Sequence, residues 1–366
     1  MLRQRRLMAS VVPGGGRLWC QGLRPALQVT PDSGGLWMQF YECEAYYWAA
    51  VSRLAATLAV IDPQGGAQLA AEAEAYRNDL RAAVARSIAL SPVVPVRDGT
   101  FHSIIPFACY VRGLGTGAWG WQRDGSGTHV GPLYWETVQS AAALISPAGL
   151  LSPNDVRVQG YLDVLEDRLL LENQNVGDRD WFLGGWQYQG GLERTSNLHL
   201  AGDDIPVFLR SFLNCYAIDI LPNDGYIFNE HAVHGPPDKV FEEAAFLERF
   251  RNLLVMEDGP NLWLARATPR AWLEPGKKIS VKNAPTHFGS VDYEILSDVD
   301  HGRITAFVKM PSRHAAKAVW LRLRHPQSAP IRSVRVNGKR WKDFDSSREI
   351  VILHSNTERV TVEINY

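Results

Sequence analysis

Four carboxylates lie in stretches of the sequence where an acidic side chain could take part in catalysis. Glu230 stands in an aromatic, extended run, Y-I-F-N-E-H, and the others are Glu193, Asp98 and Glu136. Cleavage of a glycosidic bond generally needs two carboxyl groups, one protonated to assist the leaving oxygen and one to activate water or attack carbon. We predict Glu230 as the base. Glu193 is the best candidate for the acid, because burial among aromatic side chains would raise its pKa.

Two glycine-rich loops carry many aromatic residues. They read G-L-G-T-G-A-W-G-W-Q-R-D-G and W-F-L-G-G-W-Q-Y-Q-G-G. Flat aromatic rings suit the apolar C–H faces of pyranose sugars, although filling the space between helices would explain them equally well. The residues predicted to bind substrate are Trp119, Trp121, Arg123, Asp124, Trp181, Trp186, Tyr188, His199 and His231.

Helices must hold these loops in place. Apolar residues recur at helical spacing over 36–61, 66–90, 132–145, 155–173, 204–221 and 237–256. The short link Asp62-Pro63 makes the first two an antiparallel helical hairpin. Asp203 caps the fifth helix, which begins at Asp204, and we interpret these two aspartates as a helix cap rather than as a catalytic pair.

The pattern changes from helical to alternating after the last helix. Short strands at hairpin spacing are predicted from residue 262 to the C-terminus, with a type I′ turn at Asn337-Gly338. Such a series of strands is typical of an antiparallel β-sandwich. The expected organisation is an irregular lead-in over 1–35, a helical-hairpin (α/α) domain over 36–258 and a β-sandwich domain over 259–366.

Composition excludes several classes of function. The 366 residues carry a net charge of −1, which argues against nucleic acid as a partner because phosphate binding needs a basic surface. There is no apolar run long enough to span a membrane and no signal peptide, so a cytoplasmic location is the default expectation. Four widely spaced cysteines and the absence of metal or phosphate motifs predict no metal and no cofactor.

The arrangement of helical hairpins, aromatic loops and a trailing sandwich resembles the six-hairpin glycosidases, whose catalytic domain is an (α/α)6 toroid. Residues 261–295 are similar to the sandwich that follows the toroid in uncharacterised bacterial members. The run Y-I-F-N-E-H resembles a T-x-W-E segment of α-L-rhamnosidase-type enzymes that supplies a catalytic carboxylate, and Glu230 matches that position. Asn229 replaces the motif's tryptophan, and His231 stands where arginine is common.

This resemblance implies a glycoside hydrolase that acts on an oligo- or polysaccharide, most often with inversion. A full toroid has about twelve helices, whereas six or seven are predicted here. The resemblance therefore implies either that an N-terminal half of the domain is missing from this chain or that the chain is a trimmed relative of the family.

Two other functions stay open. A polysaccharide lyase shares the toroid-plus-sandwich architecture, and it would use Tyr188 and His199 to remove a proton beside a uronate. A non-catalytic glycan-binding fragment of a larger enzyme would bind sugar without turnover.

Overall fold

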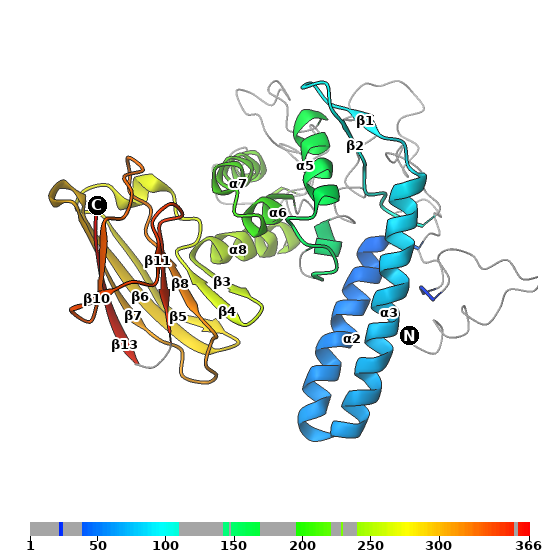
Figure 1. Ribbon diagram of the computed structural model, residues 1–366, viewed down its shortest axis with the longest axis horizontal. Coiled ribbons are helices and arrows are strands. Elements are labelled where there is room, and N and C mark those ends of the chain that lie inside the picture. The colour runs from blue at the N-terminus through cyan, green and yellow to red at the C-terminus, as the bar shows by residue number, and fades with distance from the viewer. Residues whose placement is uncertain are drawn as a thin grey trace, which may run out of the picture. The chain divides into compact units, whose positions relative to one another are not determined.

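The structure is a computed structural model (Figure 1). It describes residues 22–24, 39–109, 142–145, 148–168, 195–220, 228–229, 240–354 and 358–366. The chain divides into two compact units, Met1–Ala245 and Phe246–Tyr366. The first unit holds helices, and the second holds most of the strands. Within the described ranges, every helix is too short or too polar to cross a bilayer.

The first unit begins with a long antiparallel hairpin of α2 (Tyr41–Ile61) and α3 (Pro63–Leu90), as the sequence predicts. Asp62 joins them, and its Oδ1 accepts a hydrogen bond of 3.0 Å from the N–H of Gly65. Gly66 allows close packing, because a Cβ built there would lie 2.5 Å from the Cα of Ala59.

The remaining helices of the described residues are shorter, and two short strands pair between α3 and α5. Their bounds are β1 (Val94–Pro95), β2 (Phe101–His102), α5 (Val156–Arg168), α6 (Thr195–Ala201), α7 (Ile205–Ile220) and α8 (Val240–Leu254). Buried side chains from α2, α3, α5 and α6 contribute to one hydrophobic core, which includes Tyr76, Tyr161 and Leu198.

The second unit contains two sheets. The six-stranded sheet has the order β10-β9-β13-β7-β6-β5, and its neighbouring strands are all antiparallel. The five-stranded sheet has the order β11-β12-β8-β4-β3, in which β4 and β8 are parallel. The elements are β3 (Val255–Asp258), β4 (Asn261–Leu264), a 3-10 turn η4 (Arg270–Leu273), β5 (Lys278–Thr286), β6 (Gly289–Asp298), a second 3-10 turn η5 (Val299–His301), β7 (Arg303–Lys309), β8 (Val319–Arg322), β9 (Ser333–Val336), β10 (Lys339–Trp341), β11 (Phe344–Asp345), β12 (Ile350–Leu353) and β13 (Arg359–Asn365).

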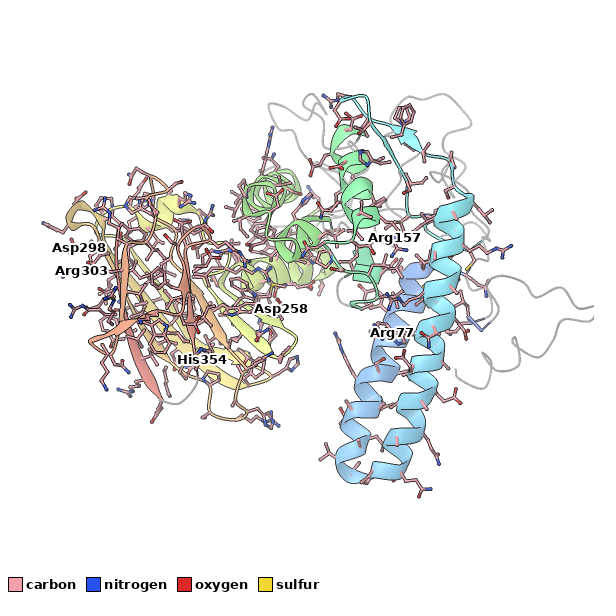
Figure 2. The ribbon with its side chains drawn as sticks, viewed as in Figure 1. Arg77, Arg157, Asp258, Asp298, Arg303 and His354 are labelled. Atoms are coloured by element: carbon pink, nitrogen blue, oxygen red, sulfur yellow. The ribbon has the colours of Figure 1, made fainter. Side chains whose placement is uncertain are left out.

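Alternating side chains of the two sheets enter a common hydrophobic core. Leu264 and Leu321 come from the five-stranded sheet, and Ile295 and Ala306 come from the six-stranded sheet. The side chains between them face solvent, as in Asp298 and Arg303, which lie side by side with oxygen and nitrogen 2.7 Å apart (Figure 2). A period of two residues therefore sets the inner and outer faces.

Two details of the strand region can be checked against the sequence. Asn337 and Gly338 both have positive φ, 49° and 76°, and they connect β9 to β10, so the predicted type I′ turn is confirmed. The helix expected to reach residue 256 ends at Leu254 instead. Val255 pairs with Leu264 and is buried in the sheet core, and this pairing overrides the helical pattern. The toroid and the sandwich stay predictions.

Candidate functional site

Three helices of the first unit meet at the cluster of polar residues that we consider the candidate site. Glu166 lies in the last turn of α5, His199 lies in the last turn of α6, and Asp204 directly precedes α7. One donor atom from each of the three side chains lies within 4.8 Å of the other two. The Oε1 atom of Glu166 is 3.8 Å from Nδ1 of His199. We call this set the Glu-His-Asp cluster.

The turn between α6 and α7 fixes two members of the cluster relative to each other. Asp203 adopts a left-handed conformation with φ of 68°. The N–H of Asp203 donates to the carbonyl of Leu200 at 3.2 Å, and the N–H of Asp204 donates to the carbonyl of His199 at 2.8 Å. These two bonds form a Schellman motif, which ends α6 and brings Asp204 back beside His199.

Asp204 also begins the next helix. Its Oδ1 accepts a long hydrogen bond of 3.4 Å from the N–H of Val207, and its carbonyl accepts from Phe208. The sequence predicted the cap at Asp203, whereas the structure has it at Asp204, because Asp203 takes the left-handed conformation that ends α6. The second oxygen of Asp204 remains available to the cluster, because a carboxylate has two acceptor atoms.

Burial moves the pKa values of Glu166 and His199 in opposite directions. Loss of water around Glu166, followed by the charges of Asp204 and Asp163, raises the pKa of Glu166 to about 7. Burial lowers the pKa of His199 to about 4. At neutral pH His199 is therefore an uncharged imidazole and Glu166 is partly protonated, so their contact is not an ion pair.

His199 is buried, and one of its ring nitrogens lacks a hydrogen-bond partner among the described residues. The residue is only 2 % exposed, and its Nε2 atom has no hydrogen-bond partner among the described residues. A buried polar atom without a partner costs free energy, so such atoms are few in native proteins. Nδ1, on the other side of the ring, faces Glu166.

The cluster has ligand types that a divalent cation accepts, two carboxylates and one imidazole. Ligand atoms around a zinc ion lie roughly 3.4 Å apart, given bond lengths of about 2.1 Å. The separations of up to 4.8 Å in the cluster are wider than this. A cation would also oppose protonation of Glu166. The cluster is therefore compatible with a bound divalent cation or with a proton held by Glu166.

A row of polar residues at the surface ends at Asp163, three positions before Glu166 on α5. Asp98, in the turn between β1 and β2, accepts hydrogen bonds from the N–H and the hydroxyl of Thr100 at 2.8 and 2.7 Å. The Thr100 hydroxyl has one hydrogen, so Nε2 of His102, 2.7 Å away, must be the donor to its oxygen. His102 lies 3.7 Å from Asp163, one of the charges that act on Glu166.

Asp98 and His199 are the predicted site residues that the structure describes. Asp98 is fully exposed, and its two bonds from Thr100 lower its pKa, so it is ionised at neutral pH and suits a turn better than a proton donor. His199 belongs to the Glu-His-Asp cluster. The other predicted residues lie outside the described residues: Glu230, Glu193, Glu136, Trp119, Trp121, Arg123, Asp124, Trp181, Trp186, Tyr188 and His231.

Sequence reasoning missed Glu166. The sequence feature that could have identified it is its position on α5. It lies four residues after the buried Leu162 and directly after the buried Leu165. A glutamate that continues an apolar helical stripe lies at the edge of the core, where its charge is poorly solvated.

Comparisons with known proteins do not identify the function of this site. No family model matches the chain, and no curated protein matches its sequence. One solved structure to which it is similar is named "Glycoside hydrolase", with 8 % identity and a TM-score of 0.33. The match covers 63 % of this chain and 45 % of that one, so the chain spans less than half of that protein's length. A similarity at this level carries no argument about fold or chemistry.

Proposed function

We propose that the chain is a carbohydrate-active enzyme, a glycoside hydrolase in which Glu166 is the general acid. The observation that carries the proposal is a carboxyl group with a pKa of about 7 in direct proximity to a second carboxylate, Asp204. Two neighbouring carboxyl groups with different protonation states are what glycoside cleavage requires. The resemblance to six-hairpin glycosidases points to the same reaction.

The environment of the cluster separates the roles of the two carboxyl groups. Glu166 is about half protonated at pH 7, so a large fraction of the protein carries the proton that the leaving oxygen needs. Asp204 is exposed and raises the pKa of Glu166 through its negative charge. The neutral His199 fills the space between the helices without adding a positive charge, which would lower the pKa of Glu166.

The proposed reaction follows the usual order of bond changes. Glu166 donates its proton to the glycosidic oxygen as the bond from that oxygen to the anomeric carbon breaks. Asp204 attacks the anomeric carbon and forms a glycosyl ester. Water then attacks that carbon, Glu166 accepts a proton from the water, and the Asp204 carboxylate leaves. The net change is hydrolysis of one glycosidic bond.

The spacing of the two carboxyl groups favours retention at the anomeric carbon. Retaining enzymes hold the two groups about 5–5.5 Å apart, whereas inverting enzymes leave about 6.5–9.5 Å for a water molecule. The oxygens of Glu166 and Asp204 lie within 4.8 Å, somewhat closer than in retaining enzymes and too close to leave the gap that inverting enzymes need. The resemblance instead implied inversion, with Glu230 as the base. The anomeric configuration of the released sugar distinguishes the two assignments, because a retaining enzyme keeps it and an inverting enzyme reverses it.

The test is a panel of aryl glycosides and polysaccharides with the purified chain and its Glu166→Gln variant. We expect turnover to fall about 10²- to 10⁴-fold in the variant, which is the usual contribution of a general acid. Asp167→Asn is the matched control, because Asp167 is the next residue on α5 and pairs with Arg97 on the surface. If Glu166→Gln keeps wild-type turnover while Glu230→Gln or Glu193→Gln loses it, Glu166 is not the general acid and the role belongs to one of those two residues.

A further inference from the structure

The outer face of the six-stranded sheet is hollowed over β5, β6, β7 and β13. The hollow has a volume of about 380 Å³. Side chains that line it and point away from the core include Lys282, Glu294, Phe307, Lys309, Arg359 and Thr361. We call this surface the sheet hollow.

Strand register arranges these side chains in two rows. Glu294, Phe307 and Thr361 are consecutive partners across β6, β7 and β13. Asp292, Lys309 and Arg359 form the neighbouring row. Cross-strand partners lie about 4.5–5.5 Å apart at their Cβ atoms, so each row presents its groups at a repeat close to that of a sugar unit.

An irregularity in the edge strand shapes one wall of the sheet hollow. The register of β5 against β6 shifts between Val281 and Ala284. Asn283 takes a left-handed conformation with φ of 53°, and its N–H donates to Oδ1 of Asp292 at 2.6 Å. A β-bulge bends its strand and often accompanies a binding site.

Phe307 is unusual for the solvent face of a sheet. Its side chain is 44 % exposed, while Glu294 and Lys309 stand close by. The outer face of an antiparallel sheet is ordinarily polar. An exposed ring between hydrogen-bonding groups suits a ligand with an apolar face and polar edges, which describes a saccharide ring.

The charges of the sheet hollow are not balanced. Asp292 lies 3.8 Å from Lys309, and Glu294 forms an ion pair with Lys278. Lys282 and Arg359 have no ion-pair partner among the described residues. Two unpaired cations beside an exposed ring are complementary to a ring that carries a carboxylate.

We propose that the sheet hollow binds an acidic saccharide chain, with one ring on Phe307 and its carboxylates near Lys282 and Arg359. The choice of a saccharide rests on the proposed function, whereas the preference for negative charge rests on the hollow itself. A binding surface on the second unit would hold a polymeric substrate independently of the Glu-His-Asp cluster.

The test is calorimetric titration of the full chain with tetragalacturonate, maltotetraose and a short thymidine oligonucleotide. All titrations use the Glu166→Gln background, so that turnover cannot consume the sugar. We expect tetragalacturonate to bind, and Phe307→Ala to weaken it about tenfold, since an aromatic contact contributes roughly that much. The double variant Lys282→Gln/Arg359→Gln should weaken it by a similar factor and reduce the dependence on salt.

Matched controls lie on the same sheet face outside the hollow. Leu296→Ala removes an exposed apolar side chain, and Arg335→Gln removes an exposed charge. Both variants should bind tetragalacturonate with the same affinity as the parent protein. Equal affinity for maltotetraose or for the oligonucleotide would overturn the proposal, as would unchanged binding in all hollow variants. Binding without turnover by the wild type would count against the proposed function and leave the sheet hollow supported.

Discussion

Oε1 of Glu166 lies 3.8 Å from Nδ1 of His199, and the same burial drives the two groups toward their uncharged forms. The carboxyl group of Glu166 has a pKa of about 7 and stays largely protonated below that pH. The imidazole of His199 has a pKa of about 4 and stays uncharged above that pH. A low-dielectric environment disfavours charge of either sign, which explains both shifts.

Turnover should fall with rising pH because the proposed reaction needs protonated Glu166. We expect the basic limit of kcat/KM near pH 7, with a tenfold fall per pH unit above it. Asp163→Asn removes one of the charges that raise this pKa, so the limit should move to lower pH by a few tenths of a unit to about one unit. Asp167→Asn should leave it in place. A basic limit that is the same in all three proteins would exclude Glu166 as the group that titrates.

The stability of the first unit should respond to removal of the Glu166 carboxyl. Its pKa is raised on folding, so the folded state binds more protons than the unfolded state between about pH 4.5 and 7, and stability falls as pH rises through that window. Glu166→Gln should therefore be more stable than the wild type at pH 8 and little changed at pH 4.5. The side chain is 34 % exposed, and after allowance for solvent screening we expect a gain of about 1 kcal/mol. Urea unfolding followed by helical circular dichroism measures it.

His199 should produce the opposite dependence. Its pKa is lowered on folding, so the unfolded state binds more protons between about pH 4 and 6.5, and stability is lost as pH falls through that range. The loss reaches about 3 kcal/mol, from a shift of roughly 2.5 pKa units. Wild-type stability should then fall by about 2 kcal/mol as pH drops from 6.5 to 4, because the gain of about 1 kcal/mol from Glu166 offsets only part of the loss from His199.

Single variants should separate these two effects. Glu166→Gln should become less stable as pH falls from 6.5 to 4, and His199→Gln should become more stable as pH falls from 7 to 4.5. The double variant should show neither trend. A wild-type protein that loses stability steadily with acid, with the same slope in Glu166→Gln, would contradict the opposed shifts.

Much of the secondary structure follows from local patterns in the sequence. The α2–α3 hairpin was predicted because Asp62 and Pro63 interrupt a long apolar period, and the β9–β10 turn because Asn337 and Gly338 favour positive φ. Strand β3 was not predicted, because residues 255–258 continue a helical pattern and only pairing with β4 makes them a strand. At these residues, pairing with a neighbouring strand outweighs the local preference for a helix.

The candidate site depends on contacts that no local pattern records. His199 was predicted to bind substrate, whereas Glu166 lies 33 positions earlier in the chain, inside a helix that was interpreted only as scaffold. The two meet because α5 and α6 contribute to the same core, through Tyr161 and Leu198. The helix cap was predicted one residue early, at Asp203, and the turn that places Asp204 beside His199 could not be read from the local pattern.

A partly buried ion pair should contribute to the stability of the second unit. Arg270 donates two hydrogen bonds of 2.8 Å to the two oxygens of Glu349, and Glu349 also accepts 2.8 Å from the N–H of His325. Glu349 is 7 % exposed, so its removal leaves the N–H of His325 and the Nη2 atom of Arg270 without this acceptor, while Nη1 keeps the carbonyl of His325 at 2.6 Å. Breaking a buried pair by removing one partner is much more costly than breaking an exposed pair.

We expect Glu349→Gln to lower the free energy of unfolding of this unit by about 2–4 kcal/mol. Glu274→Gln is the control, because Glu274 pairs with Lys277 on the surface and both side chains are about half exposed. That variant should change stability by less than about 1 kcal/mol. Urea denaturation followed by tryptophan fluorescence compares the two, and turnover on a good substrate should survive in both. Equal losses in the two variants would show that burial does not set the strength of the Arg270–Glu349 pair.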